Sequence, residues 1–163
     1  MVIDVQEAVK RSIMTEKNAM YFYQLGAEMM KDQSARELFE LLAREEREHA
    51  AQFHRIYKGV DIPSLEVFLD TPPDNTSSWV SSISRLIAAS FSEKKAMELA
   101  LEREKNLEET LMETAATIAD PEVRAVFEMN ARETRNHYLL IESDYARLMG
   151  MVNELDMDTY VRE

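Results

Sequence analysis

The sequence predicts an all-α fold in which two helical hairpins are joined by a long crossover. Apolar residues recur at helical spacing along four long stretches, and only three glycines and four prolines interrupt the 163 residues. In addition, residues 15–57 and 103–145 repeat one another at an offset of 88 positions, with 14 identities in 43 aligned positions. Each copy has room for two helices and a turn, so the repeat predicts a pair of related hairpins.

The first helix is expected to run from about residue 4 to Lys31. Its apolar seam steps by three and four residues, as on a helix that packs inside a bundle. The second helix is expected to begin near Ser34, a residue type that favours the N-cap position. It should end at about Lys58, because Gly59 is a stop signal. The residues of the first seam are Val9, Ile13, Glu16, Met20, Tyr23, Ala27 and Met30.

Residues Val60–Ser78 separate the two hairpins and contain Pro63, Pro72 and Pro73. Because proline interrupts a helix, this segment cannot form one regular helix, and we expect a long crossover. A short helix over about residues 79–90 should follow it.

The second hairpin has clear start signals for both of its helices. Ser92 can cap a helix over about residues 93–119. The run Asp120-Pro121-Glu122 then offers a capping acid, a proline at the first helical position and an acid in the first turn. The last helix is expected to continue from there to about Met149.

Two hairpins with one long crossover describe a ferritin-like four-helix bundle, whereas a simple up-down bundle needs no such connector. A chain of this length fits one domain and can bury a substantial core. We expect this domain to cover residues 1–150. Residues 151–163, beyond Gly150, are expected to form a C-terminal tail.

The composition excludes several classes of protein. A formal net charge of −12 argues against nucleic acid and anionic membranes as partners. There is no cysteine, so this chain has no disulfide and no Cys-ligated zinc or rubredoxin-type iron site. No stretch approaches the length of a membrane span, and the first residues lack the pattern of a signal peptide. We therefore expect a cytoplasmic protein.

Acidic and imidazole side chains fall on the buried faces of the predicted helices. Glu16 lies in the middle of the first seam, and an ionised carboxylate there is costly unless it is paired or bound to a cation. On the second helix, Glu46 and His49 point inward one turn apart. The second copy repeats the first glutamate and the histidine as Glu104 and His137. These inward faces carry no lysine or arginine that would neutralise the acids.

Carboxylates and imidazoles that face one another from four helices suit iron, manganese or zinc better than calcium or magnesium. Each residue alone has a simpler explanation. A single histidine on an apolar face is more often a hydrogen-bonded core residue, and a lone buried glutamate usually pairs with a basic side chain. The eleven methionines are more often adaptable core filler than a metal site. It is the combination of the five inward groups that predicts a metal centre.

At these residues the chain resembles the rubrerythrin branch of the ferritin-like superfamily, over nearly the whole of Val5–Met149. The family pattern is an inward glutamate on the first and third helices and Glu-x-x-His on the second and fourth, as in di-iron carboxylate bundles. The resemblance also implies that Tyr23 lies near the metal pair and modulates it, although an aromatic core residue is an equally good interpretation. The metal ligands that the resemblance implies are Glu16, Glu46, His49, Glu104 and His137.

The chain departs from the family pattern at three points. Thr134 stands where the second Glu-x-x-His glutamate belongs, and Leu107 and Leu111 stand where relatives commonly carry an acid and an aromatic residue. We expect no rubredoxin-like tail, because the sequence has no cysteine. Our hypothesis is that Glu108 supplies the missing carboxylate, because it is an inward acid where the first copy is apolar. Glu133, at the edge of the inward face, is a less favoured candidate.

The resemblance implies a non-haem oxidoreductase whose di-iron centre reduces hydrogen peroxide, or reacts with dioxygen, in oxidative stress. Electrons would come from an external electron-donor protein. Two other functions stay open. One is the storage or handling of iron or another metal, with manganese or zinc as alternatives, and the other is a structural bundle whose degenerate site binds one metal or none. Ferritin-like bundles often pair, so a homodimer is expected by analogy.

Overall fold

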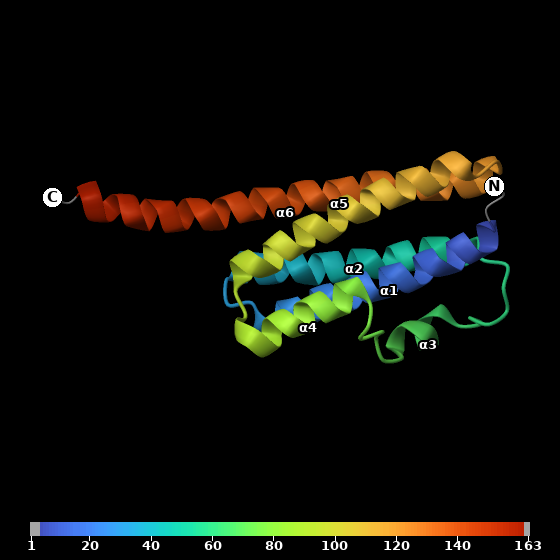
Figure 1. Ribbon diagram of the computed structural model, residues 1–163, viewed down its shortest axis with the longest axis horizontal. Coiled ribbons are helices and arrows are strands. Elements are labelled where there is room, and N and C mark those ends of the chain that lie inside the picture. Colours follow the sequence, from blue (N-terminus) through green and yellow to red (C-terminus); the bar gives the residue numbers. More distant parts are fainter. Residues whose placement is uncertain (1–3, 162–163) are drawn as a thin grey trace.

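The computed structural model describes residues 4–161, with side chains described through residue 150. Two antiparallel hairpins, α1 with α2 and α5 with α6, lie side by side, and the crossover carries α3 and α4 (Figure 1). The described part of the chain contains no strand, so the predicted all-α fold of two hairpins and a crossover is confirmed. The helices are α1 (Val5–Met29), α2 (Gln33–Arg55), α3 (Leu65–Asp70), α4 (Ser78–Ser90), α5 (Glu93–Thr117) and α6 (Pro121–Val161).

Residues of the repeat start the second helix of each hairpin. The carboxylate of Asp32 accepts a hydrogen bond of 2.9 Å from the backbone N–H of Ala35 and so caps α2. The predicted cap, Ser34, is therefore wrong: α2 has already begun there, and the Ser34 hydroxyl donates to Asp144 instead. Asp120, the copy of Asp32, accepts backbone hydrogen bonds at the start of α6 as predicted.

A repeated arginine closes the end of the first helix in each hairpin. The Arg36 guanidinium donates to the carbonyl of Met30 at 2.8 Å, and the Arg124 guanidinium donates to the carbonyl of Ala115 at 3.1 Å. Carbonyls at a helix end have no partner within the helix, so each arginine satisfies a group that would otherwise need water. The duplicated arginine thus closes both turns, although it meets a carbonyl at a different repeat position in each.

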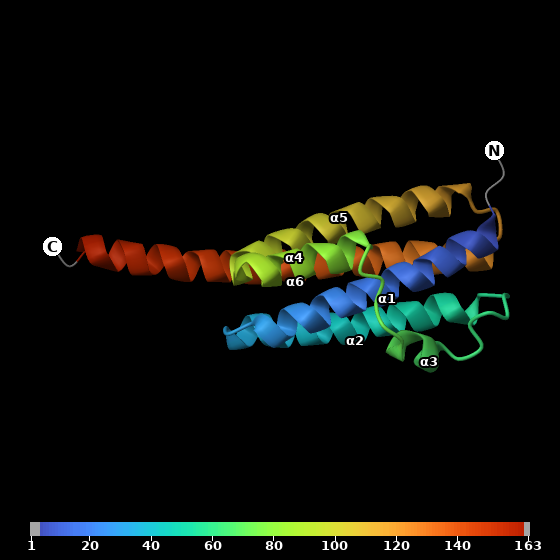
Figure 2. The ribbon, with the colours of Figure 1, turned by 60° about the horizontal axis from the view of Figure 1, so that its bottom comes forward.

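Side chains of α1 fasten the crossover to the bundle. The Tyr21 hydroxyl lies within hydrogen-bonding distance of the carbonyls of Leu69, at 2.9 Å, and Thr71, at 3.0 Å. Lys17 donates to the Thr71 hydroxyl, and its ammonium group lies 4.3 Å from the centre of the Phe68 ring. The predicted absence of one regular helix in the crossover is confirmed, since only α3 is helical before α4 begins. Figure 2 shows α3 beside the first hairpin.

The last helix continues past the predicted end. α6 runs to Val161 rather than stopping near Met149, and Figure 1 shows it extending beyond the other helices. Glycine inside a helix costs about 1 kcal/mol relative to alanine but does not by itself end the helix. Gly150 has no positive φ and so forms no left-handed cap. Side chains from residue 151 onward lie outside the described part. The division of the chain into a domain of residues 1–150 and a tail of residues 151–163 therefore stays a prediction.

Aromatic residues pack on both sides of the middle of the bundle. Phe22, Tyr23 and Phe39 form one cluster, in which the ring centres of Tyr23 lie 5.0 Å from each of the other two. Phe53 and Phe127 form another, with ring centres 4.9 Å apart. Along α2, Phe39 precedes and Phe53 follows the segment that carries the candidate ligands, so an aromatic cluster flanks this segment on each side. No described helix is long and apolar enough to cross a membrane.

Candidate metal centre

Five candidate ligands from four helices meet in the core of the bundle. One comes from α1, two from α2, and one each from α5 and α6, because the helical period places each of them on the inward face. All are at most 2% exposed, which is unusual for ionisable side chains. They are Glu16, Glu46, His49, Glu104 and His137.

Glu46 lies between the two imidazoles. Its Oε2 is 3.5 Å from Nδ1 of His49, and its Oε1 is 2.8 Å from Nδ1 of His137. The two rings are stacked, with centres 5.1 Å apart and planes 12° from parallel. One carboxylate can therefore reach the inner nitrogen of both histidines.

Each histidine also has a carboxylate of its own. Oε2 of Glu16 lies 3.7 Å from Nδ1 of His49, and Oε1 of Glu104 lies 3.6 Å from Nδ1 of His137. The cluster thus has two equivalent halves, each with one imidazole and one glutamate, and Glu46 belongs to both. This is the arrangement that the repeat of one glutamate and one histidine predicts.

Most inward-facing atoms of the cluster make no hydrogen bond to a described residue. They include both carboxylate oxygens of Glu16, Oε2 of Glu46 and of Glu104, and Nδ1 of His49. Oε1 of Glu46 and Nδ1 of His137, by contrast, lie 2.8 Å apart. Buried polar atoms are nearly always hydrogen-bonded in proteins, so a converging set without partners calls for a cation. Ligand atoms of Glu46, His49 and His137 all lie within 4.8 Å of one another, a spacing that can hold a metal ion.

The electrostatics of the metal-free cluster follow from burial and mutual contact. Burial raises the pKa of Glu16 well above its ordinary value, and the charge of Glu46 adds to this. Burial and the same charge raise the pKa of Glu104 to about 7. Burial alone would lower the pKa of the imidazoles, but the carboxylates outweigh it and raise the pKa to about 12 at His49 and about 10 at His137. Both imidazoles therefore carry a proton that a cation has to displace.

Carboxylates also lie against the outer nitrogens of the histidines. Oε2 of Glu133 is 2.5 Å from Nε2 of His49, and Oε1 of Glu45 is 3.6 Å from Nε2 of His137. Each acid comes from the helix opposite its histidine, and the pair are copies in the repeat. A carboxylate on Nε2 fixes the ring so that Nδ1 faces the centre. Sequence reasoning did not assign this role to Glu45, although the identity of Glu45 and Glu133 in the repeat is a signal for it.

A family model of rubrerythrin matches residues 7–145, which is most of the chain. The chain belongs to the rubrerythrin family. No curated protein and no solved structure matches it. Membership confirms the ferritin-like identity of the bundle, since the match covers both hairpins and the crossover between them.

The metal centre of this rubrerythrin-family chain is asymmetric at Thr134. Thr134 is fully buried on α6, and its hydroxyl oxygen makes no hydrogen bond to a described residue. It is the copy of Glu46, so the second half supplies no carboxylate between the imidazoles. Asn130, one turn earlier, donates to the side-chain oxygen of Gln52 and to the carbonyl of Val126 rather than reaching the centre.

The structure does not bring Glu108 into the cluster. Its Oε2 lies 3.8 Å from the guanidinium of Arg135, and its side chain is 24% exposed at the rim of the second hairpin. Glu133 does reach the centre, but on the outer nitrogen of His49. Glu108 stays a predicted ligand, and this placement does not support it.

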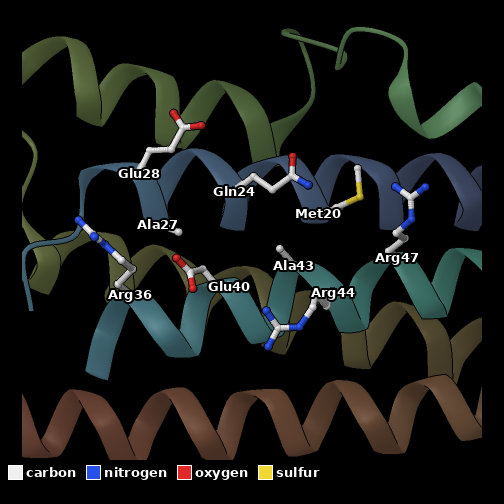
Figure 3. Close-up of a pocket in the computed structure, with 9 residues that line it drawn as sticks. All are labelled: Met20, Gln24, Ala27, Glu28, Arg36, Glu40, Ala43, Arg44 and Arg47. Atoms are coloured by element: carbon white, nitrogen blue, oxygen red, sulfur yellow. The ribbon is translucent and has the colours of Figure 1, made fainter. Parts of the chain in front are cut away.

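A groove of about 570 Å³ lies on the outer face of the first hairpin and contains none of the candidate ligands (Figure 3). Three arginines of α2 and two glutamates give it a mixed charge. The rubrerythrin-family centre therefore does not open into this groove. The groove is lined by Met20, Gln24, Ala27, Glu28, Arg36, Glu40, Ala43, Arg44 and Arg47.

Proposed function

We propose that this rubrerythrin-family protein holds two iron ions and reduces hydrogen peroxide to water. The observation that carries the proposal is the position of Glu46, which lies near the inner nitrogen of both histidines while each histidine has a further carboxylate beside it. The residues present fit two cations that share one glutamate. A single ion would leave one half of the cluster without a partner.

The positions of the donor atoms indicate which residues would hold each ion. Glu16 and His49 would hold one, Glu104 and His137 the other, and Glu46 would serve both. Three carboxylates offset most of the charge of two divalent cations, and mixed carboxylate and imidazole donors suit iron, with manganese and zinc as alternatives. Iron is favoured because the chain belongs to the rubrerythrin family.

The bound iron would supply the change of oxidation state and the polarisation of the O–O bond that peroxide reduction needs. The reaction consumes one peroxide, two electrons and two protons and yields two water molecules. We propose that a separate electron-donor protein supplies the electrons, because a chain without cysteine carries no rubredoxin-type site. The protein's own residues enclose the centre, hold the imidazoles through Glu45 and Glu133, and hold Glu104 through Tyr23.

Anaerobic reconstitution with Fe²⁺ tests this proposal. The loaded protein is mixed with hydrogen peroxide and followed by stopped-flow absorbance. We expect one peroxide to oxidise two Fe²⁺ per chain, faster than it oxidises the same concentration of free Fe²⁺. A His49→Gln variant, which removes one donor, should lose this acceleration. Oxidation at the rate of free Fe²⁺ in the unmodified protein would rule out a peroxidase.

Iron handling is the second candidate, and Thr134 favours it. This centre has one carboxylate fewer between the imidazoles than a centre with glutamate at position 134. It would therefore bind iron less tightly and release it more readily. Repeated additions of Fe²⁺ in air distinguish the two functions. Oxidation of many irons per chain, with release of Fe³⁺, would support handling. If fewer than one ion per chain were bound after reconstitution, the result would support a purely structural role.

We also propose that the protein forms a homodimer through the groove on α1 and α2. Figure 3 shows Glu28 and Glu40 toward one end of the groove, together with Arg36, and Arg44 and Arg47 toward the other. A two-fold axis would place the acids of one copy against the arginines of its partner. Sedimentation velocity should show that changing both of these arginines to glutamate separates the copies. Changing both glutamates to arginine in the same chain should restore the dimer.

A further inference from the structure

A second cavity, of about 220 Å³, lies between α1, α5 and the start of α4 and reaches the side of the metal centre. Its inner end is closed by Glu16, whose side chain is only 1% exposed. Arg11, which is exposed, and Arg103, which is half-buried, line it nearer the surface. A small molecule in this cavity would therefore lie between two guanidinium groups and a candidate metal ligand.

The charge of this cavity is opposite to that of the whole chain. The chain has a formal net charge of −12, yet the charged residues that line the cavity are two arginines and the enclosed Glu16. Arg103 makes no ion pair within the described part of the chain, and its buried Nε has no hydrogen-bond partner. A buried donor on a permanent cation is costly to leave unsatisfied, and a guanidinium matches the geometry of a carboxylate.

The size and the walls of the cavity indicate what accompanies the anionic group. Its volume is about seven times the share of one water molecule in the liquid, so it exceeds what hydrogen peroxide needs. Leu107, Leu111 and Trp79 provide apolar wall, and all three are buried. A ligand that fits has an anionic end for Arg103 and a short hydrocarbon part for the leucines.

We propose that this cavity binds a small organic carboxylate, with its carboxylate on Arg103 and its apolar part directed along Leu107 toward Glu16. Such a ligand would lie next to the metal centre without occupying it. The site is built from residues that the peroxide reaction does not use, apart from the enclosed Glu16. Binding therefore does not depend on the proposed function, and the two can fail separately.

Trp79 makes the proposal directly measurable. It is the single tryptophan of the chain and lines this cavity, so its fluorescence reports on this site. The full-length protein is titrated with butyrate, both as purified and after removal of metal with a chelator. Butanol and butylammonium, which have the same hydrocarbon part, serve as matched probes. We expect a saturable change with butyrate and at least tenfold weaker binding of the other two.

Variants locate the carboxylate. Arg103→Gln should weaken butyrate binding at least tenfold, and Arg103→Lys, which keeps the charge but loses the planar fork, should weaken it less. Arg85→Gln, on the same helix as Trp79 but outside the cavity, should bind as the unmodified protein does. Circular dichroism confirms that each variant is folded. Equal binding of butyrate and butanol, no saturable response, or unchanged binding by a folded Arg103→Gln would each overturn the proposal.

Discussion

The hydroxyl of Tyr23 on α1 donates a hydrogen bond of 2.5 Å to Oε1 of Glu104 on α5, 81 residues further along the chain. Both side chains are fully buried. Burial and the nearby carboxylates raise the pKa of Tyr23 well above its ordinary value, so the phenol keeps its proton and remains a donor. The bond ties the first hairpin to the second and fixes a carboxylate of the metal centre.

Replacement of Tyr23 by phenylalanine should affect both stability and metal binding. The change leaves Glu104 without its donor, which is expected to destabilise the metal-free protein by about 1–3 kcal/mol. Loss of an outer hydrogen bond to a ligand should also weaken metal retention, by about tenfold or more. Thermal unfolding and competition with a chelator measure the two effects.

Tyr21→Phe is the matched control for this variant. It removes a hydroxyl that contacts the carbonyls of Leu69 and Thr71 in the crossover, far from the ligands. It should lower stability while metal retention stays the same. Equal loss of metal in both tyrosine variants would show that general loosening of the bundle, rather than the contact with Glu104, is responsible.

Thr134→Glu should restore a carboxylate between the imidazoles. The new side chain would stand one turn before His137, as Glu46 stands before His49, and we expect metal affinity to rise at least about tenfold, or about 1.4 kcal/mol. The metal-free variant should be less stable than the unmodified protein, because one more carboxylate is buried without a partner. Metal counting and chelator competition test the first effect, and thermal unfolding tests the second. Thr134→Gln, of the same size without the charge, should gain no affinity.

The fold could be predicted from the sequence because each helix has an apolar seam and the repeat marks both hairpins. The sequence places the start of α2 two residues late, since Asp32 and Ser34 are both good capping residues and only the structure shows which one meets Ala35. The sequence places the end of α6 too early, because glycine is permitted within a helix as well as after one. At Gly150 the local sequence alone does not determine whether the helix ends.

The inward direction of the candidate ligands could also be predicted, but the reach of long side chains could not. Glu45 and Glu133 lie at the edge of the inward face and are 40% and 38% exposed, yet their carboxylates face the outer nitrogens of His137 and His49. Glu108 points inward on a helical projection but faces Arg135 instead. A projection gives an angle around one helix and contains no information on how two helices cross.

The two outer carboxylates should differ in importance. Oε2 of Glu133 lies 2.5 Å from Nε2 of His49, whereas Oε1 of Glu45 lies 3.6 Å from Nε2 of His137, so the first ion pair is much the closer of the two. Glu133→Gln should therefore weaken metal affinity by about 10- to 100-fold, and Glu45→Gln by less. Chelator competition on the two variants measures this. A larger loss in Glu45→Gln would contradict the structural asymmetry.

Glu108→Ala tests the ligand that the sequence favoured. Because the Glu108 carboxylate faces Arg135 at the rim, we expect the variant to bind as many ions as the unmodified protein, with unchanged affinity. Glu16→Ala is the matched change at an enclosed carboxylate and should lose metal. If Glu108→Ala lost one ion per chain, the sequence-based hypothesis would be correct, and the side chain would have to turn inward when metal binds.

Metal binding should release protons and become tighter as pH rises. The pKa of His49 is raised to about 12 and that of His137 to about 10, so both imidazoles are protonated in the metal-free protein at neutral pH. A metal needs the neutral ring, and protons therefore compete with it at any pH below these values. Calorimetric titration with Zn²⁺ in two buffers of different protonation enthalpy should show at least two protons released on filling both halves, because Glu16 and Glu104, whose pKa values are also raised, lose protons to the metal as well.

The histidines of the chain provide the controls for this measurement. His137→Gln should release about one proton fewer, because one protonated ring is gone. His54→Gln should leave the proton count unchanged, since Nε2 of His54 lies 2.8 Å from the carbonyl of Ile62, outside the centre. Affinity that does not change between about pH 6 and 9 would mean that the rings are already neutral.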